Sequence, residues 1–333
     1  MFSTHKTDTR LRPASSDREQ GFTLIEMMVA MAIGLVLILG AVNIYAQGRQ
    51  SFRTAESIAR VQENARFALD LMGPDIRLVN FWGRNSEAAY VAPPAGLIVT
   101  CNAADVSAWA LNLVNGIEAV DDGYTLPCPA FSGAQPNSDV LVLRHASGQP
   151  AAPTAGRLQI QSGRVSAALF NTGIIPGGAI PAPPASVTHD VVVNAYYVDQ
   201  QSSLGANVPS LRRLSLVPAA GGGAGTMQDQ EIIPGVESLQ VQLGIDTTDD
   251  GAADRYVDSD AGIITPGDIA FDPDAEVVSV RLWMLVRAEQ RENGHTDAGP
   301  YVPPDADLAA ITPNDAFRRM ALTTTIKLRN TGS

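Results

Sequence analysis

The chain has 333 residues and a formal net charge of −12 at pH 7, with 45% hydrophobic and 17% charged residues. An acidic chain lacks the basic surface that neutralises phosphates, which excludes general nucleic-acid binding. The hydrophobic content can build a core, so a wholly disordered chain is also excluded. Two cysteines are too few for a cysteine-rich metal module or a dense disulfide scaffold.

The N-terminus combines a polar leader, residues 1–21, with an apolar run from Phe22 to Ala46. A helix over this run is about 37 Å long, which exceeds the roughly 30 Å of a bilayer core. The run therefore predicts a transmembrane segment, and a helix buried in a domain is the alternative. Basic residues lie on both sides of this segment, so their distribution alone does not decide its orientation. We place the leader in the cytoplasm because it is short and everything globular lies downstream.

Glu26 is the one acidic or basic side chain in this run. A carboxylate inside a membrane helix costs about 2.5 to 3.5 kcal/mol on insertion scales, which makes it a candidate functional residue. If the chain is cut after Gly21, the new α-amine of Phe22 lies one helical turn before Glu26. It can pair with Glu26 of the same helix or, better, of a neighbouring helix. The alternative is that Glu26 lies near the membrane edge and stays hydrated.

The segment GFTLIEMMVAMAIGLVLI resembles the class III signal of type IV prepilins and pseudopilins. The resemblance implies that a prepilin peptidase cuts between Gly21 and Phe22 and methylates the new N-terminus at Phe22. It also implies that Glu26 acts in assembly.

After Ala46 the apolar pattern becomes amphipathic. Apolar residues recur at spacings of three and four: Ile58, Val61, Ala65, Ala68, Leu69, Met72 and Ile76. Gly73-Pro74 predicts a stop or a kink. We therefore predict one helix from Phe22 to Met72, whose amphipathic half, within residues 47–76, packs on a globular domain formed by residues 77–333.

Strand signals dominate the globular part. Strands are predicted over Asp139–His145, Asp190–Val198, Leu211–Val217, Glu237–Ile245, Val277–Arg287 and Leu322–Arg329. Gly- and Pro-rich loops lie between them, such as Gly173–Ser186 and Pro218–Gly225. The predicted fold is α+β and pilin-like: a long N-terminal helix packed on a mostly antiparallel β-sheet domain with long loops.

Three further segments resemble PilW-type minor pilins: RVQENARFALDLMGPDIRLVNFWG, IIPGVESLQVQLGIDTTDDGAADRYV, and VVSVRLWMLVRAE with FRRMALTTTIKLRN. The resemblance implies a single-pass inner-membrane protein with a periplasmic domain that can join the pilus fibre. It implies that the protein primes or supports type IV pilus assembly, with other minor pilins and the major pilin as partners. The alternatives are a J-type-like minor pseudopilin of type II secretion and a membrane-tethered periplasmic binding module or enzyme.

Cys101 and Cys128 are the only cysteines. A periplasmic domain lies in a compartment that favours a disulfide. Closing this loop stabilises by about 3 kcal/mol in the chain-entropy model. Two unpaired buried thiols are the alternative.

DTTDDGAADRY resembles a calcium loop in its spacing. Asp246, Thr248, Asp250 and Asp254 occupy positions one, three, five and nine of that pattern, with a glycine at position six. The bidentate glutamate of position twelve is missing, because Val257 stands there. An acidic hairpin turn built on Asp-Asp-Gly is the alternative.

The sequence contains no recognisable catalytic motif. The four histidines are scattered without metal-ligand spacing, and the glycine-rich PAAGGGAG lacks the Lys-Ser/Thr of a phosphate loop. We therefore expect no enzymatic activity and no cofactor other than calcium.

Overall fold

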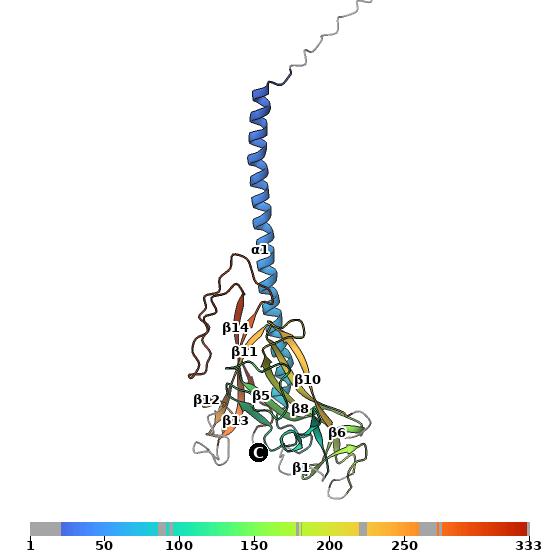
Figure 1. The fold of residues 1–333 in the computed structure, drawn as a ribbon. Coiled ribbons are helices and arrows are strands. Elements are labelled where there is room, and N and C mark those ends of the chain that lie inside the picture. The colour runs from blue at the N-terminus through green and yellow to red at the C-terminus, as the bar shows by residue number, and fades with distance from the viewer. Residues whose placement is uncertain are drawn as a thin grey trace, which may run out of the picture. The chain divides into compact units, whose positions relative to one another are not determined.

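The computed structural model describes residues 21–85, 91–92, 96–177, 180, 182–219, 225–259, 272 and 275–331. Residues 1–20 of the predicted leader lie outside the described residues, as does part of each predicted Gly- and Pro-rich loop. The chain divides into two compact units, Met1–Thr54 and Ala55–Ser333. Helix α1, Leu24–Leu78, supplies residues to both (Figure 1).

In the first unit α1 is apolar and exposed. Large apolar side chains from Phe22 to Tyr45 are all exposed. The most apolar 18-residue window has a mean hydropathy of 2.5 with none of it buried, and by length and composition the helix can cross a membrane. A helix that is apolar all round is typical of a membrane span. The prediction of a long apolar N-terminal helix is confirmed.

In the second unit α1 is amphipathic, as predicted. Its buried apolar side chains recur at spacings of three and four residues: Val61, Ala65, Ala68, Met72 and Ile76. Ile58, predicted for the same face, is 40% exposed, and Leu69 is partly buried. The face that packs on the core therefore begins one turn later than the pattern suggests.

The predicted helix end at Met72 is wrong, because α1 continues through Pro74 to Leu78. A proline inside a helix costs about 3 kcal/mol, since it removes one N–H donor and crowds the carbonyl four residues earlier. Burial of Met72 and Ile76 on either side offsets that cost. The chain leaves the helix at Asn80, whose φ of 62° is the left-handed conformation that commonly ends helices.

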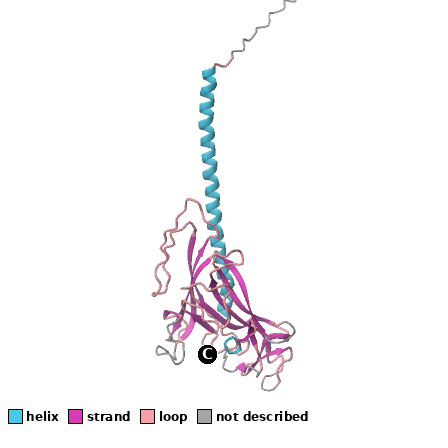
Figure 2. Cartoon of the chain, in the orientation of Figure 1, coloured by secondary structure: helices cyan, strands magenta, loops and turns pink. Residues whose placement is uncertain are grey.

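Two β-sheets complete the second unit (Figure 2). In the described residues the large sheet has ten strands: β1 (Val91–Ala92), β2 (Val99–Cys101), β3 (Ala104–Asp105), β4 (Ile117–Val120), β5 (Val140–Pro150), β6 (Ala155–Ser162), β7 (Ala167–Thr172), β8 (Val187–Asp199), β9 (Ser210–Val217) and β10 (Gly225–Pro234). The small sheet has four: β11 (Val236–Asp246), β12 (Arg255–Asp258), β13 (Glu276–Arg287) and β14 (Arg319–Lys327). A short helix, α2 (Ser107–Ala110), follows β3.

The pairing of these strands confirms a mostly antiparallel fold. The large sheet runs β1-β7-β6-β8-β9-β10-β2-β3, with β4 paired to β5 and β5 paired to β8. The small sheet runs β12-β11-β13-β14. Of the pairs between described strands, β1 with β7 and β2 with β10 are the parallel ones.

Both faces of the large sheet are buried. On β5, Leu141 and Leu143 lie in one hydrophobic core with α1 and the small sheet. Val140 and Val142 lie in a second core, which also contains Trp82. Successive side chains of a strand point to opposite faces, so a strand between two cores is apolar throughout. This explains why the first four residues of β5, VLVL, are all apolar.

The six predicted strands are all present, as β5, β8, β9, β11, β13 and β14, with boundaries moved by a few residues. The predicted inner face of β11 is buried: Leu239, Val241, Leu243 and Ile245. So is that of β13: Val278, Val280, Leu282, Met284 and Val286. These two strands pair directly, with Leu239 opposite Met284 and Leu243 opposite Val280.

A polar contact anchors the last turns of α1 on the large sheet. The Asp75 carboxylate accepts hydrogen bonds from Asn194 Nδ2 at 2.5 Å and the Tyr196 hydroxyl at 2.6 Å, both on β8. His145 Nε2 on β5 lies 3.7 Å from the other Asp75 oxygen. Burial acts to raise the pKa of Asp75, but these neighbours lower it overall. The charged carboxylate thus holds the helix end to two neighbouring strands.

Candidate processing and assembly site

Residues 21–26 contain the segment before α1 and the first residues of the helix. Gly21, Phe22 and Thr23 precede the helix, which begins at Leu24. Phe22 is 87% exposed, and its two neighbours are exposed as well. The predicted scissile bond between Gly21 and Phe22 therefore lies in accessible backbone outside the helix, where proteolytic cleavage is favoured.

Thr23 and Glu26 cap the first turn of α1. Thr23 Oγ1 accepts a hydrogen bond from the Glu26 N–H at 3.3 Å. Glu26 Oε2 in turn accepts bonds from the backbone N–H and the hydroxyl of Thr23, each at 3.1 Å. This is a capping box, in which each side chain satisfies a backbone donor of the other residue. Thr23 is absent from the predicted site residues, although Thr-x-x-Glu before an apolar run is a known helix-start signature.

The capping box gives Glu26 a local partner in the uncut chain. The predicted partner, the α-amine of Phe22, exists only after cleavage, so that pairing stays a prediction. Before cleavage the nitrogen of Phe22 is an uncharged amide. Cleavage therefore adds a positive charge within one turn of a carboxylate that Thr23 already positions.

We expect Thr23→Ala to fray the first turn of α1. Losing an N-cap side chain costs about 1 kcal/mol, which corresponds to about a fivefold change in the opening equilibrium. Amide hydrogen exchange at Glu26, measured on the uncut chain in detergent micelles, should accelerate by about this factor. Thr23→Ser keeps the hydroxyl and should exchange like the wild type. Equal exchange in all three proteins would contradict the capping box.

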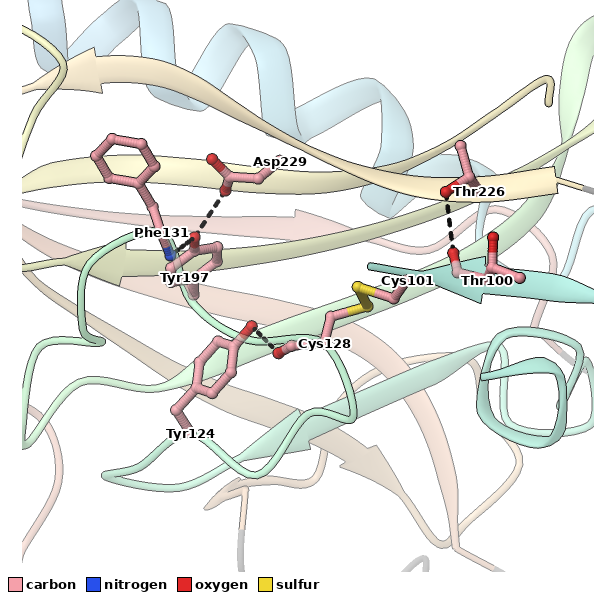
Figure 3. Close-up of a disulfide and its surroundings, with 8 residues drawn as sticks. All are labelled: Thr100, Cys101, Tyr124, Cys128, Phe131, Tyr197, Thr226 and Asp229. Carbon is pink, nitrogen blue, oxygen red and sulfur yellow. Dashed lines mark hydrogen bonds between the residues drawn. A yellow bond between two sulfur atoms is a disulfide. The ribbon is translucent and has the colours of Figure 1, made fainter. Parts of the chain in front are cut away.

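Cys101 and Cys128 are joined in a disulfide (Figure 3). Cys101 ends β2 and Cys128 lies in the loop between β4 and β5, with Cα atoms 5.7 Å apart. The Tyr124 hydroxyl donates to the Cys128 carbonyl at 2.7 Å, and the Thr226 hydroxyl donates to the Thr100 carbonyl at 3.1 Å (Figure 3). The disulfide therefore ties a long loop to a short strand near the end of the large sheet.

The acidic loop between Asp246 and Asp254 connects β11 to β12. The Asp246 carboxylate accepts backbone N–H bonds from Thr248 at 2.9 Å and Gly251 at 2.6 Å. Asp254 accepts both the backbone N–H and the hydroxyl of Thr247, at 2.8 and 2.9 Å. Burial acts to raise the pKa of Asp246, but the backbone donors lower it overall.

These contacts are those of the acidic hairpin turn that the sequence also allowed. The carboxylate oxygens accept amides of their own loop, and Gly251 has the positive φ of 73° that suits such a turn. Within the part of the chain that the structure describes, Asp246, Asp250 and Asp254 do not form a group of three converging carboxylates. Calcium binding by this loop stays a prediction.

Two family models match separate parts of the chain, one near its N-terminus and one in its C-terminal half. The family model for the type IV pilus-assembly protein W matches residues 195–330, and the prokaryotic N-terminal methylation motif matches residues 16–42. A type IV-like pilin from Thermus thermophilus aligns at 12% identity with a TM-score of 0.33, covering 81% of this chain and 97% of that chain. No match was found among curated proteins.

The two family matches fall on the features described above. The methylation motif covers residues 21–26 and most of the exposed apolar part of α1. The PilW match begins inside β8 and runs through the small sheet to the end of β14. Both matches point to a structural, non-catalytic protein with a membrane anchor, and they confirm the predicted family. The chain is a type IV pilin-like protein that carries a PilW domain over residues 195–330 and an N-terminal methylation motif over residues 16–42.

Proposed function

We propose that this chain is a minor pilin that primes or supports type IV pilus assembly together with other minor pilins and the major pilin. The observation that carries the proposal is the exposed apolar helix that begins at Leu24, shortly after Gly21, inside the methylation-motif match and in one chain with a PilW domain. A prepilin peptidase would cut between Gly21 and Phe22 and methylate Phe22.

The anchored state follows from the exposed half of α1. Residues 22–46 would span the inner membrane, with the leader in the cytoplasm and the globular domain in the periplasm. The disulfide supports this placement, because disulfides persist in oxidising compartments such as the periplasm. In a fibre, the same apolar surface would pack against the helices of neighbouring pilins, since it must be kept from water in either setting.

Glu26 would guide the transfer from membrane to fibre. An unpaired carboxylate in a membrane helix costs about 2.5 to 3.5 kcal/mol on insertion scales. The Phe22 amine of a neighbouring chain would give Glu26 an additional charge partner that is present only in the assembled state. The pair would thus favour incorporation and fix the axial register of neighbouring helices.

We expect Glu26→Gln and Glu26→Ala to be cut normally but to enter fibres about tenfold less, since losing about 1.4 kcal/mol changes an equilibrium tenfold. Glutamine still closes a capping box with Thr23, whereas alanine does not. The glutamine variant therefore separates charge from capping. Immunoblots of sheared fibres and of membranes give incorporation and processing. Glu56→Gln, an exposed glutamate farther along α1, is the matched control.

Normal incorporation of Glu26→Gln would contradict the charge-pair argument. If only Glu26→Ala then failed, the carboxylate would matter through the capping box instead.

The amount of major pilin in sheared surface fibres, with this gene deleted and then restored, tests the proposed function. We expect fibres to be lost on deletion and to return on complementation. Unchanged fibres together with lost export of secreted enzymes would assign the chain to a type II secretion pseudopilus. Unchanged fibres and unchanged export would contradict an assembly role.

A further inference from the structure

Three carboxylates from distant parts of the chain meet in the second unit. Asp121 and Asp122 directly follow β4, and Asp305 lies in the connection between β13 and β14. One oxygen from each lies within 4.8 Å of the oxygens from the other two. Like charges at this distance repel one another. The arrangement is therefore unfavourable unless a positive group compensates it.

Asp305 is the most buried of the three and lacks a full set of partners. Its exposure is 6%, and its Oδ1 accepts the backbone N–H of Asp307 at 2.8 Å. Its Oδ2 is buried and has no hydrogen-bond partner among the described residues. Native proteins rarely leave such an atom unsatisfied, and a bound ion or water is the usual explanation.

Neighbouring hydrogen bonds hold the Asp121 carboxylate and the Asp122 backbone in position. Ser259, directly after β12, donates its hydroxyl to Asp121 at 2.9 Å. The backbone N–H of Asp122 donates to Asp139 at 3.0 Å, and the N–H of Val241 on β11 donates to the other Asp139 oxygen at 2.7 Å. The loop that carries Asp121 and Asp122 is thus fixed to both β11 and β12. The Asp121 carboxylate and the backbone that carries Asp122 are therefore positioned before any ligand arrives.

The donor set selects a hard cation. It consists of carboxylate oxygens, which suit calcium, magnesium or manganese rather than zinc or copper. Calcium binds oxygen at about 2.3 to 2.6 Å, so two oxygens on one ion are at most roughly 5 Å apart, and three oxygens within 4.8 Å of one another can share one calcium ion. Magnesium demands a near-ideal octahedron at about 2.0 to 2.1 Å and is usually held by one or two carboxylates.

We propose that Asp121, Asp122 and Asp305 bind one calcium ion. The ion would join the segment after β4 to the β13–β14 connection, two parts of the chain that are far apart in sequence. This position differs from the calcium loop predicted between Asp246 and Asp254, where the oxygens accept backbone amides. A substitution at Asp305 should therefore weaken calcium binding, whereas a substitution in the acidic loop should not.

Calcium chloride is titrated into the chelator-treated full chain in detergent micelles by isothermal titration calorimetry, and thermal unfolding is recorded in parallel. We expect one ion per chain. When the free calcium concentration is about tenfold above Kd, the equilibrium constant of unfolding should fall about tenfold and Tm should rise by about 3 to 6 °C. Magnesium at the same concentration should raise Tm less. An equal rise with magnesium would overturn the assignment to calcium.

Asp305→Asn is the decisive variant, because it keeps the acceptor for the Asp307 amide and removes the charge. We expect its calcium affinity to fall at least about tenfold and its calcium-dependent Tm rise to disappear. Without calcium, its Tm should equal or exceed that of the wild type, because the repulsion is relieved; this also shows that the variant is folded.

Asp250→Asn, an exposed residue of the acidic loop, is the matched control and should bind calcium like the wild type. The proposal is overturned if Asp305→Asn keeps the wild-type affinity, if Asp250→Asn alone loses it, or if the wild type binds no calcium up to about 10 mM, above the weakest range of extracellular sites.

Discussion

Replacing Arg319 with alanine is expected to lower the free energy of unfolding by about 3 to 5 kcal/mol, because it removes a buried cation shared by the buried Asp297 and the half-buried Glu237 and Asp315. The Arg319 side chain is 3% exposed and lies 2.5 Å from Glu237, 2.6 Å from Asp315 and 3.2 Å from Asp297. Arg319 begins β14, Glu237 is on β11, and both aspartates lie between β13 and β14. One guanidinium thus fixes this long connection to the small sheet.

Urea unfolding of the full chain in detergent micelles, followed by tryptophan fluorescence, measures this loss. Arg157→Ala is the matched control, since Arg157 pairs with Asp190 at 2.7 Å but its side chain is 46% exposed. An exposed pair contributes less than about 1 kcal/mol, so the control should lose little stability. Equal losses in the two variants would contradict the argument from burial.

The same variant should change the response to acid. Hydrogen bonds from Arg319 lower the pKa of Asp315 from its ordinary 3.8 to about 2. A lowered pKa means that the stabilisation is present above pH 4 and is lost as pH falls through 2. We therefore expect the wild type to lose stability between pH 4 and 2, and Arg319→Ala to lose less over the same interval.

Removing the disulfide, by Cys101→Ala together with Cys128→Ala, is expected to lower the free energy of unfolding by about 3 kcal/mol. The bond closes a loop with a sequence separation of 27, and without it the unfolded chain gains conformational freedom. Both cysteines are nearly fully buried in the second hydrophobic core, so loss of their packing adds to the effect. Urea unfolding of the oxidised wild type and the double variant gives the difference.

A reducing agent provides the control for this result. Dithiothreitol should destabilise the wild type by a similar amount and leave the double variant unchanged, because the variant contains no disulfide. If reduction leaves the wild-type midpoint where it was, the bond contributes nothing to stability.

The apolar elements of this fold could be predicted because their periodicity is strong. β11 alternates strictly, β13 has one face that is apolar throughout, and α1 carries a long apolar run followed by a face at spacings of three and four residues. Pro74 misled the prediction because local backbone preference favours a helix end there, whereas the flanking residues are buried in the core. Tertiary packing overrode the local signal.

Strand β6 could not be predicted from its sequence because its buried side chains include polar ones. Gln159 and Gln161 are both fully buried, which breaks the usual apolar signature. Their amides are satisfied by residues distant in sequence, Asp190 at 2.9 Å and Ser186 at 2.6 Å. The same limit applies to the Asp121, Asp122 and Asp305 group and to the carboxylates around Arg319, which only the folded chain brings together.

The candidate processing site, by contrast, could be predicted from the sequence, because its residues lie close together in the chain. Gly21, Phe22 and Glu26 were predicted as a group from the motif they share. Thr23 could have been included, since its spacing to Glu26 is the capping-box spacing. In a short motif the spacing along the chain determines which residues meet, whereas for carboxylates far apart in sequence only the tertiary fold does.

The mature N-terminus provides the most direct test that this chain is handled as a pilin. The protein is purified from membranes of cells that make type IV pili, digested, and its N-terminal peptide identified by mass spectrometry. For the wild type, we predict a peptide that begins at N-methylated Phe22 and no peptide from residues 1–21. In a variant with a bulky residue at the cleavage position, such as Gly21→Leu, we predict that the leader is retained. A wild-type protein that keeps residues 1–21 would contradict the assignment.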